Sequence, residues 1–484
     1  MKVKINIFVL IVAAVYAVLT VVAWDFCYFW DAVQQVSKEA HWFYLTDFSS
    51  LLIPSENAFG ITSTGYHPPL LSMLTAALWK VFGYKIWVSH AFTAICAALL
   101  IYNLWKLLLN FLTKKYAGWV LLILLLEPAV LSQFVIVSPD FIIFTAFIIA
   151  FRAIFERKTV ILSITMIFLC CINIRGAFVG AALFICNIFY EISANNSEKS
   201  QRFSIQRFTK ILLPYLPVLL LLTAYYLYYF SQNGWFFGNG KSAYEEHYKM
   251  PREFSFVVQQ WAAYVLRSIE CGRIIIWLLS FYVFYIIFKN KINIAPRPKT
   301  LLVFVIIMYV LYFVLISVTQ MPFGTRYFIP QFFALTLFAL IFLIENVNFV
   351  KMKIIFAVIL LFEITGHFWV YPEKIAQSWD STLAHIPYYE LRRETFRFID
   401  DNKFIYNEIA GGFVISGNNK FIQLADTNAI IGGDMEHAKY FLYSNISNLN
   451  DEKIAELKNP QLWIPIKTFK KCAVFITVYK RNEK

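Results

Sequence analysis

The chain has 484 residues, of which 59% are hydrophobic, 19% are aromatic and only 15% are charged. Soluble domains hold about 25% charged residues, so the composition excludes an ordinary soluble domain. A formal net charge of +13 would suggest nucleic-acid binding in a soluble protein. Here the positive residues fall mostly in short connections between apolar segments, where they act as a topology signal, and no nucleic-acid partner is expected.

The first apolar segment covers residues 5–23 and follows Lys2 and Lys4. Its apolar run of about 19 residues is longer than the hydrophobic region of a typical signal peptide, and no small-residue cleavage site follows it. We therefore expect an uncleaved first span, with the basic N-terminus in the cytoplasm.

Ten further apolar segments follow along the chain. Because a helix needs roughly 20 residues to cross a membrane, they predict an all-α polytopic membrane protein with about eleven transmembrane helices and additional interfacial helices. The segments are about 86–105, 117–136, 140–155, 160–174, 177–190, 211–230, 273–288, 301–319, 327–344 and 352–370.

Positive residues at the ends of these segments set the expected topology. Basic connections belong in the cytoplasm, and this assignment requires that Pro68–Gly83 does not cross and that 160–190 is two passes broken at Arg175-Gly176. The alternative makes Pro68–Gly83 a true span and moves the next two basic loops outside. The basic connections lie around Lys106/Lys114/Lys115, Arg152/Arg157/Lys158, Lys199/Arg202/Arg207/Lys210, Lys289/Lys291/Arg297/Lys299 and Lys351/Lys353.

The C-terminal part has a different pattern. Residues 372–484 contain no apolar run of span length, and the strand-like pieces GGFVISG, KFIQLA and CAVFITVYK alternate with helix-like ones. This pattern predicts a small extracytoplasmic α/β domain after a transmembrane domain over residues 1–371. We expect an integral protein of a bacterial inner (plasma) membrane, with the C-terminal domain outside.

Two carboxylates follow the first span in an aromatic surrounding. Asp25 and Asp31 stand beside Trp24, Tyr28 and Trp30, in an outer segment that we expect to lie along the interface. A partly desolvated carboxylate there can orient or deprotonate a hydroxyl or amine nucleophile. The alternative is that Asp25 caps a helix and Asp31 faces water.

Other polar groups are expected at the same outer face. His67, Arg175 and Arg326 could help to hold a phosphate, and Asp140 opens an apolar helix where its charge suits the helix dipole. His67 could equally end a loop and Arg326 anchor an interface. Glu127, followed by proline inside a span, is either a buried or paired acid at a kink or a catalytic group.

Metal and nucleotide motifs are weak or absent in the sequence. Glu246 and His247 match no standard metal-site spacing, and there is no Walker loop and no GxGxxG motif before a helix. The sequence indicates no definite cofactor and no metal ligands, although a divalent metal stays open.

The order of several short motifs resembles the GT-C glycosyltransferases of the protein O-mannosyltransferase and lipid A aminoarabinose transferase kind. The resemblance covers roughly residues 5–345. The motifs are Asp25-x-x-Tyr28-x-Trp30, Gly65-Tyr66-His67-Pro68-Pro69-Leu70, Phe82-Gly83, Ser138-Pro139-Asp140, Arg175-Gly176 and Arg326-Tyr327-Phe328-Ile329-Pro330.

The resemblance implies a hexosyl- or pentosyltransferase that moves a sugar from a polyprenyl-phosphate carrier to a protein, lipid or glycan acceptor at the outer face. It implies that Asp25 is the first acid, the base or the acceptor-orienting group, and that Asp140 is the second. The family often has Asp-Glu where this chain has Asp25-Phe26, so Asp31 is the alternative catalytic acid.

The same resemblance assigns the groups that bind the substrate. His67, Arg175 and Arg326 would hold the lipid-linked phosphate, and the tyrosines of the same motifs would contribute to the substrate site. The family frequently has lysine where His67 stands, and a histidine carries charge only part of the time near neutral pH. These tyrosines are Tyr28, Tyr66 and Tyr327.

Two other function classes remain open. A transporter or flippase of a lipid-linked glycan would usually show internal repeats and broken helices at the membrane midplane, and the sequence has no evident repeat. A binding or assembly protein would act through its C-terminal domain, so its activity would be lost on truncation after about residue 371.

Overall fold

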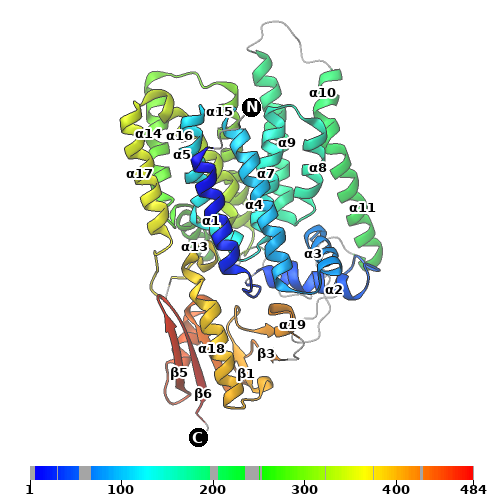
Figure 1. The fold of residues 1–484 in the computed structure, drawn as a ribbon, viewed down its shortest axis with the longest axis vertical. Coiled ribbons are helices and arrows are strands. Elements are labelled where there is room, and N and C mark those ends of the chain that lie inside the picture. The colour runs from blue at the N-terminus through cyan, green and yellow to red at the C-terminus, as the bar shows by residue number, and fades with distance from the viewer. Residues whose placement is uncertain are drawn as a thin grey trace.

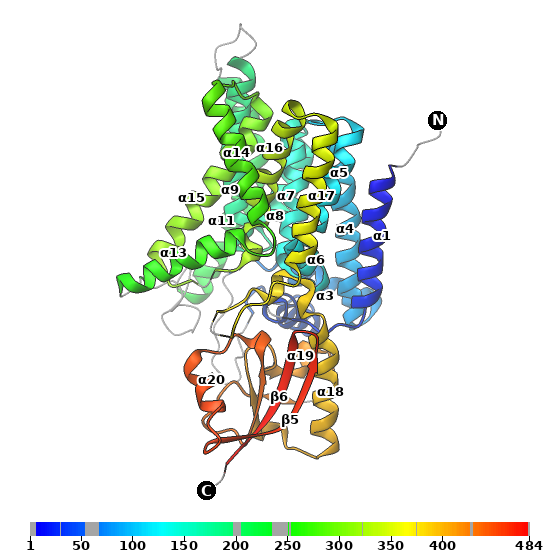
Figure 2. The ribbon, with the colours of Figure 1, turned by 90° about the vertical axis from the view of Figure 1, so that its left-hand side faces the viewer.

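The computed structural model describes residues 6–29, 31–53, 67–196, 205–234, 250, 253–321, 323–373, 375–425 and 429–482. A long helical bundle occupies one part of the molecule, and a smaller α/β region covers one end of it (Figures 1 and 2). This arrangement confirms the predicted class: a helical membrane protein with a small C-terminal α/β region.

The bundle is built from helices of very different lengths. Its elements are α1 (Ile7–Ala23), α4 (Ile86–Leu108), α5 (Lys114–Leu126), α6 (Pro128–Val135), α7 (Pro139–Phe155), α8 (Thr159–Cys170), α9 (Ile174–Asn196), α10 (Ile205–Leu212), α11 (Leu216–Asn233), α13 (Phe254–Ile269), α14 (Ile274–Asn290), α15 (Pro296–Val318), α16 (Ile329–Asn346) and α17 (Phe349–Gly366). Figure 2 shows α7 and α16 near the middle of the bundle, and nearly all of their side chains are buried.

Five helices in the described part of the chain are long and apolar enough to cross a membrane, or seven if each of two bent helix pairs counts as one span. Every predicted apolar segment contains a helix, but several of these helices are shorter than a full span. The count of eleven spans therefore stays a prediction.

Local sequence explains both bends. Pro128 has no backbone N–H to continue α5, and the chain turns by 57° into α6. Between α13 and α14 the chain turns by 90° at Cys271 and Gly272, which have φ of 57° and 84°. Figure 2 shows α13 lying across the lower part of the bundle, an orientation that suits an interfacial helix.

Short helices lie where the bundle meets the C-terminal region. The π-helical turn Val33–Lys38 leads into α2 (Glu39–Leu45), which packs against α3 (Leu70–Phe82). Helix α3 has 13 residues, which rise about 20 Å, less than the roughly 30 Å of the hydrocarbon core. Helix α8, within the predicted span 160–174, is shorter still with 12 residues, so length alone does not separate the two, and the expectation that Pro68–Gly83 does not cross stays a prediction.

The C-terminal region contains a four-stranded mixed sheet in the order β1-β4-β6-β5. Strand β1 (Ile409–Gly411) runs parallel to β4 (Tyr440–Ser444), whereas β6 (Val474–Arg481) is antiparallel to both β4 and β5 (Trp463–Lys471). A second pair joins β2 (Gly417–Asn418) and β3 (Ile430–Ile431). The region's helices are α18 (Pro387–Asp401), which packs on β5 and β6, α19 (Asn419–Ile422) and α20 (Asp451–Leu457).

The three strand-like pieces have different outcomes. CAVFITVYK contains most of β6, as predicted, whereas KFIQLA contains most of the short helix α19 and GGFVISG is largely a turn. The prediction for KFIQLA was wrong because the Asn418 side chain accepts from the Lys420 backbone N–H at 2.9 Å and so starts a helix. Helix α17 ends at Gly366, and the domain boundary at residue 371 stays a prediction.

Candidate functional site

Two arginines and three aspartates meet at the end of the bundle next to the C-terminal region. Arg326 Nη2 lies 2.6 Å from Asp31 Oδ2, and its Nε lies 3.1 Å from Asp140 Oδ2. Arg175 Nε lies 3.2 Å from Asp140 Oδ1. Arg326 also pairs with Asp380. We call these five residues the arginine–aspartate cluster.

Three helices begin at this cluster, and their sequences fix where they begin. The Ser138 side chain accepts from the Asp140 backbone N–H at 3.1 Å and caps α7. Asn173 Oδ1 accepts from the Gly176 backbone N–H at 3.1 Å at the start of α9. Arg326 lies in the 3-10 turn Thr325–Phe328 that leads into α16. Helix N-termini carry partial positive charge, so the cluster lies where anions are favoured.

The position after Arg175 requires glycine for a steric reason. A Cβ atom on Gly176 would lie 2.0 Å from the carbonyl oxygen of Leu169, so only glycine lets α9 start this close to the end of α8. The Arg-Gly pair in the sequence therefore reflects the close approach of the end of α8 to the start of α9, which places the arginine at the turn between them.

Both arginine side chains are nearly inaccessible to solvent and stack on one aromatic ring. Their exposed fractions are 9% for Arg175 and 6% for Arg326. The guanidinium carbons lie 4.3 Å and 5.0 Å from the centre of the Tyr327 ring, close enough for cation–π attraction. Asp31 is the most accessible aspartate of the cluster, with its side chain 22% exposed.

The electrostatics of the cluster decide the charge of two groups. Burial alone would raise the pKa of Asp31, but Arg326 and Arg175 outweigh it and hold that pKa below its usual value, so Asp31 is ionised at neutral pH. Burial and the nearby Arg175 lower the pKa of His67 to about 4. His67 is therefore neutral at pH 7 and can contribute a hydrogen bond but no positive charge.

The sequence reasoning missed Asp380. It lies in the segment after α17, in the 3-10 turn Trp379–Ser381, and has an exposed side-chain fraction of 3%. A lone aspartate in a polar tail gives no signal of its own. Only the fold shows that this segment returns to the bundle, where Ser132 and Gln133 donate hydrogen bonds to the Asp380 carbonyl oxygen at 2.7 Å and 2.6 Å.

Other predicted site residues lie apart from the cluster or outside the described residues. Asp25 pairs with Arg393 of α18 at 2.9 Å, and the two side chains are 68% and 47% exposed. The Tyr28 hydroxyl is buried and lies 2.5 Å from Ser89 Oγ. Tyr66 lies outside the described residues. Asp31 contacts both arginines of the cluster, whereas Asp25 lies apart from them, and which of the two carboxylates is catalytic stays a prediction.

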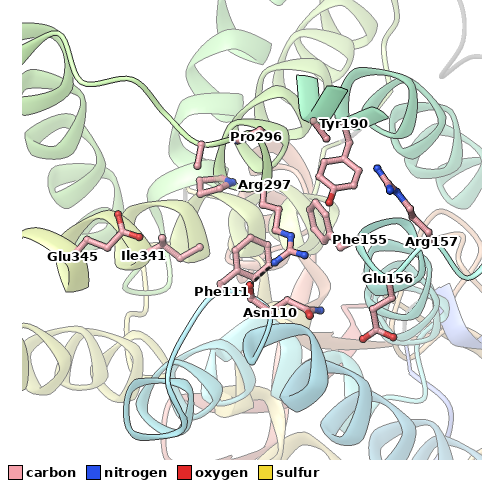
Figure 3. Close-up of a pocket in the computed structure, with 13 residues that line it drawn as sticks. Asn110, Phe111, Phe155, Glu156, Arg157, Tyr190, Pro296, Arg297, Ile341 and Glu345 are labelled. Carbon is pink, nitrogen blue, oxygen red and sulfur yellow. Dashed lines mark hydrogen bonds between the residues drawn. The ribbon is translucent and has the colours of Figure 1, made fainter. Parts of the chain in front are cut away.

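A pocket of about 530 Å³ lies at the opposite end of the bundle (Figure 3). Its charged side chains include Glu156 and Arg157, at the end of α7, whereas Asp140 of the cluster lies in the first turn of the same helix. Seventeen residues of helix separate the two ends, about 25 Å. Glu156 pairs with Arg152, Arg157 pairs with Glu191, and Arg297 donates to the Asn110 carbonyl oxygen at 3.0 Å.

One group of possible metal ligands lies in the part of the chain that the structure describes. Asp434, Glu436 and His437 bring possible ligand atoms together, but all three are exposed and lie in the C-terminal region. Glu246 and His247 lie outside the described residues.

Comparisons with known proteins identify the fold. No protein-family model and no curated protein matches the chain. Two crystal structures of ArnT from Cupriavidus metallidurans, one bound to undecaprenyl phosphate and one apo, have TM-scores of 0.55 and 0.52 at 11% identity, covering 97% of both chains. An Archaeoglobus fulgidus oligosaccharyltransferase matches with a TM-score of 0.41 and 13% identity over 74% of this chain and 55% of that chain. The chain therefore shares the GT-C fold of ArnT, which the order of its motifs predicted.

Proposed function

We propose that this protein is an integral membrane glycosyltransferase that moves a sugar from a polyprenyl-phosphate carrier to an acceptor at the extracytoplasmic face. The observation that carries the proposal is the pair of buried arginines, Arg175 and Arg326, that share the carboxylates of Asp31 and Asp140. The shared fold adds support, because one of the ArnT structures is bound to undecaprenyl phosphate.

In this proposal the two arginines bind the phosphate of the donor. Guanidinium groups form paired, charge-assisted hydrogen bonds to phosphate oxygens, and the starts of α7, α9 and α16 add partial positive charge. Asp140 contacts both arginines and Asp380 pairs with one of them, so these two carboxylates would hold the guanidinium groups in place.

Asp31 is the proposed base. Its carboxylate contacts both arginines, so a bound phosphate would compete with it for the same N–H groups. Asp31 is also more accessible than Asp140 and Asp380. Phosphate binding would draw the arginines away from Asp31 and raise its pKa toward the ordinary range. The carboxylate could then take the proton of an acceptor hydroxyl or amine.

The reaction balances with these groups alone. The acceptor oxygen or nitrogen attacks the anomeric carbon of the sugar while Asp31 takes its proton. The bond between that carbon and the phosphate oxygen breaks, and polyprenyl phosphate leaves with the bonding electrons. The arginines stabilise the negative charge that develops on the departing phosphate.

The distribution of charge supports the proposed sidedness. Arg152 lies in the last turn of α7, and Arg157 and Lys158 follow its end, whereas the cluster lies at its beginning. Basic connections are favoured in the cytoplasm, which would place the cluster and the C-terminal region outside, in a bacterial inner membrane with a cytoplasmic N-terminus.

The test is release of polyprenyl phosphate by the purified full-length protein in proteoliposomes, supplied with polyprenyl-phosphate sugars and an acceptor mixture. Arg326→Met should abolish the release, whereas Arg393→Met, which removes an exposed arginine, should not. If the lipid-linked sugar crosses the vesicle membrane without cleavage, a flippase replaces the enzyme. If neither cleavage nor transport occurs, the proposal fails.

A further inference from the structure

Two separate stretches of backbone present the paired side chains of Arg326 and Asp380. Arg326 follows Thr325 in the turn before α16, and Asp380 lies in the turn Trp379–Ser381 after α17. Neither turn is long enough to fix its own position, so the geometry of the pair depends on what holds each backbone.

Helix α6 holds the backbone of Asp380. Ser132 Oγ donates to the carbonyl oxygens of Asp380 and Thr382 at 2.7 Å and 3.1 Å, and Gln133 Nε2 donates to that of Asp380 at 2.6 Å. At the other end of α6, Glu127 Oε2 accepts from the Val130 backbone N–H at 2.9 Å and caps the helix.

Arg273 holds the backbone before Arg326. Its Nη1 donates to the carbonyl oxygen of Thr325 at 2.8 Å, and its guanidinium carbon lies 4.7 Å from the ring centre of Phe332 in α16. The same side chain reaches Glu127, with Nε 2.8 Å from Glu127 Oε1. One guanidinium therefore connects the helix that holds Asp380 to the turn that carries Arg326.

This ion pair is fully desolvated, with exposed side-chain fractions of 1% for Arg273 and 4% for Glu127. A buried ion pair is a poor way to gain stability, because desolvation offsets most of the attraction and apolar residues of similar volume often serve as well. Such a pair instead fixes the relative orientation of the groups that it joins, because the planar guanidinium donates in set directions to two acceptors at once.

We propose that Glu127 and Arg273 are positioning residues of the site, and that their ion pair sets the geometry of Arg326 against Asp380. The expected loss of kcat rests on the proposed function, whereas the expected change in the geometry of the Arg326–Asp380 pair does not. Arg273 donates to the backbone before Arg326, and Glu127 caps the helix that holds the backbone of Asp380, so both residues act on the cluster through these two backbones.

The decisive variant is Arg273→Lys in the full-length protein. Lysine keeps the charge beside Glu127, but a single ammonium lacks the guanidinium's two-point geometry. We expect folded protein whose kcat for polyprenyl phosphate release falls by about tenfold or more, with a smaller change in KM for the acceptor. Glu127→Gln, which keeps the helix cap, should show the same pattern.

The matched control is Arg152→Lys. Arg152 pairs with Glu156 at 2.7 Å, at the opposite end of α7, so its variant should keep kcat within about twofold. A double-mutant cycle of Arg273→Lys with Asp380→Asn should be strongly non-additive, because Arg273 is proposed to act through the Arg326–Asp380 pair. Additive losses, or equal kcat in the Arg273 and Arg152 variants, would overturn the inference while leaving the proposed function standing.

A structural measurement separates the two proposals completely. In an experimental structure of the Arg273→Lys variant, the Arg326–Asp380 contact should be lost or rearranged, whereas the Arg175–Asp140 contact should remain. An unchanged Arg326–Asp380 contact refutes the positioning role even if the wild-type protein proves inactive with every polyprenyl-phosphate sugar.

Discussion

Replacing Asp31 with asparagine tests which of the two early carboxylates is the base. Asp31→Asn keeps the size of the side chain and removes its charge and its proton-accepting carboxylate. General-base catalysis contributes about 10²- to 10⁴-fold, so we expect kcat to fall by at least about 100-fold, equivalent to about 2.7 kcal/mol of transition-state stabilisation.

The same variant should not weaken binding of the leaving group. Asp31 lies 2.6 Å from Arg326 and 3.7 Å from Arg175, where it competes with phosphate for both guanidinium groups. Removing the competing charge should leave the affinity for polyprenyl phosphate unchanged or increase it. Loss of kcat with retained product affinity would distinguish a lost base from a disrupted binding site.

The control is Asp25→Asn. Asp25 and Arg393 form an exposed ion pair, and such pairs contribute about 0–1 kcal/mol to stability. We expect release activity within about twofold of wild type. Both variants are assayed in proteoliposomes by the rate of polyprenyl phosphate release, with product affinity measured separately by equilibrium binding. An active Asp31→Asn together with an inactive Asp25→Asn would refute the assignment made from the geometry.

Three further predictions concern stability, each read from thermal unfolding in detergent. Burial lowers the pKa of His385 to about 4, below the roughly 6.5 of an unfolded histidine. The unfolded chain therefore binds more protons than the folded one in this range, and Tm should fall as the pH drops from about 7 toward 4. An equally steep fall of Tm in the His385→Gln variant would contradict this prediction. Glu363 is buried in α17, with no hydrogen-bond partner for its carboxylate among the described residues, so Glu363→Met should stabilise by about 1–3 kcal/mol; a lower Tm would show that the carboxylate is needed. A Cβ atom on Gly366 would lie 2.3 Å from the Cys271 carbonyl oxygen, so Gly366→Ala should lower the stability by about 1–3 kcal/mol. Gly433 has open space around it, so Gly433→Ala should have little effect on stability. Equal effects of the two substitutions would refute the steric argument.

Four of the five residues of the arginine–aspartate cluster are candidates already in the sequence, and Asp380 is the exception. The sequence points to Arg175 because a charge between two apolar helices is rarely without a role, and the structure brings it together with Arg326 and Asp140. The sequence could not show in the same way which of Asp25 and Asp31 contacts the arginines. The two residues are six positions apart beside the same span, and only the turn of the chain between them decides which one faces the arginines.

Composition and hydropathy determined that this chain forms membrane helices, because the cost of exposing backbone polar groups to lipid leaves little choice. The motif order indicated the fold. Tertiary structure alone decided that Asp380 returns to the bundle and that Glu127 pairs with Arg273, 146 residues away in sequence. Such pairings depend on where distant helices end in space, a property that no local pattern of residues contains.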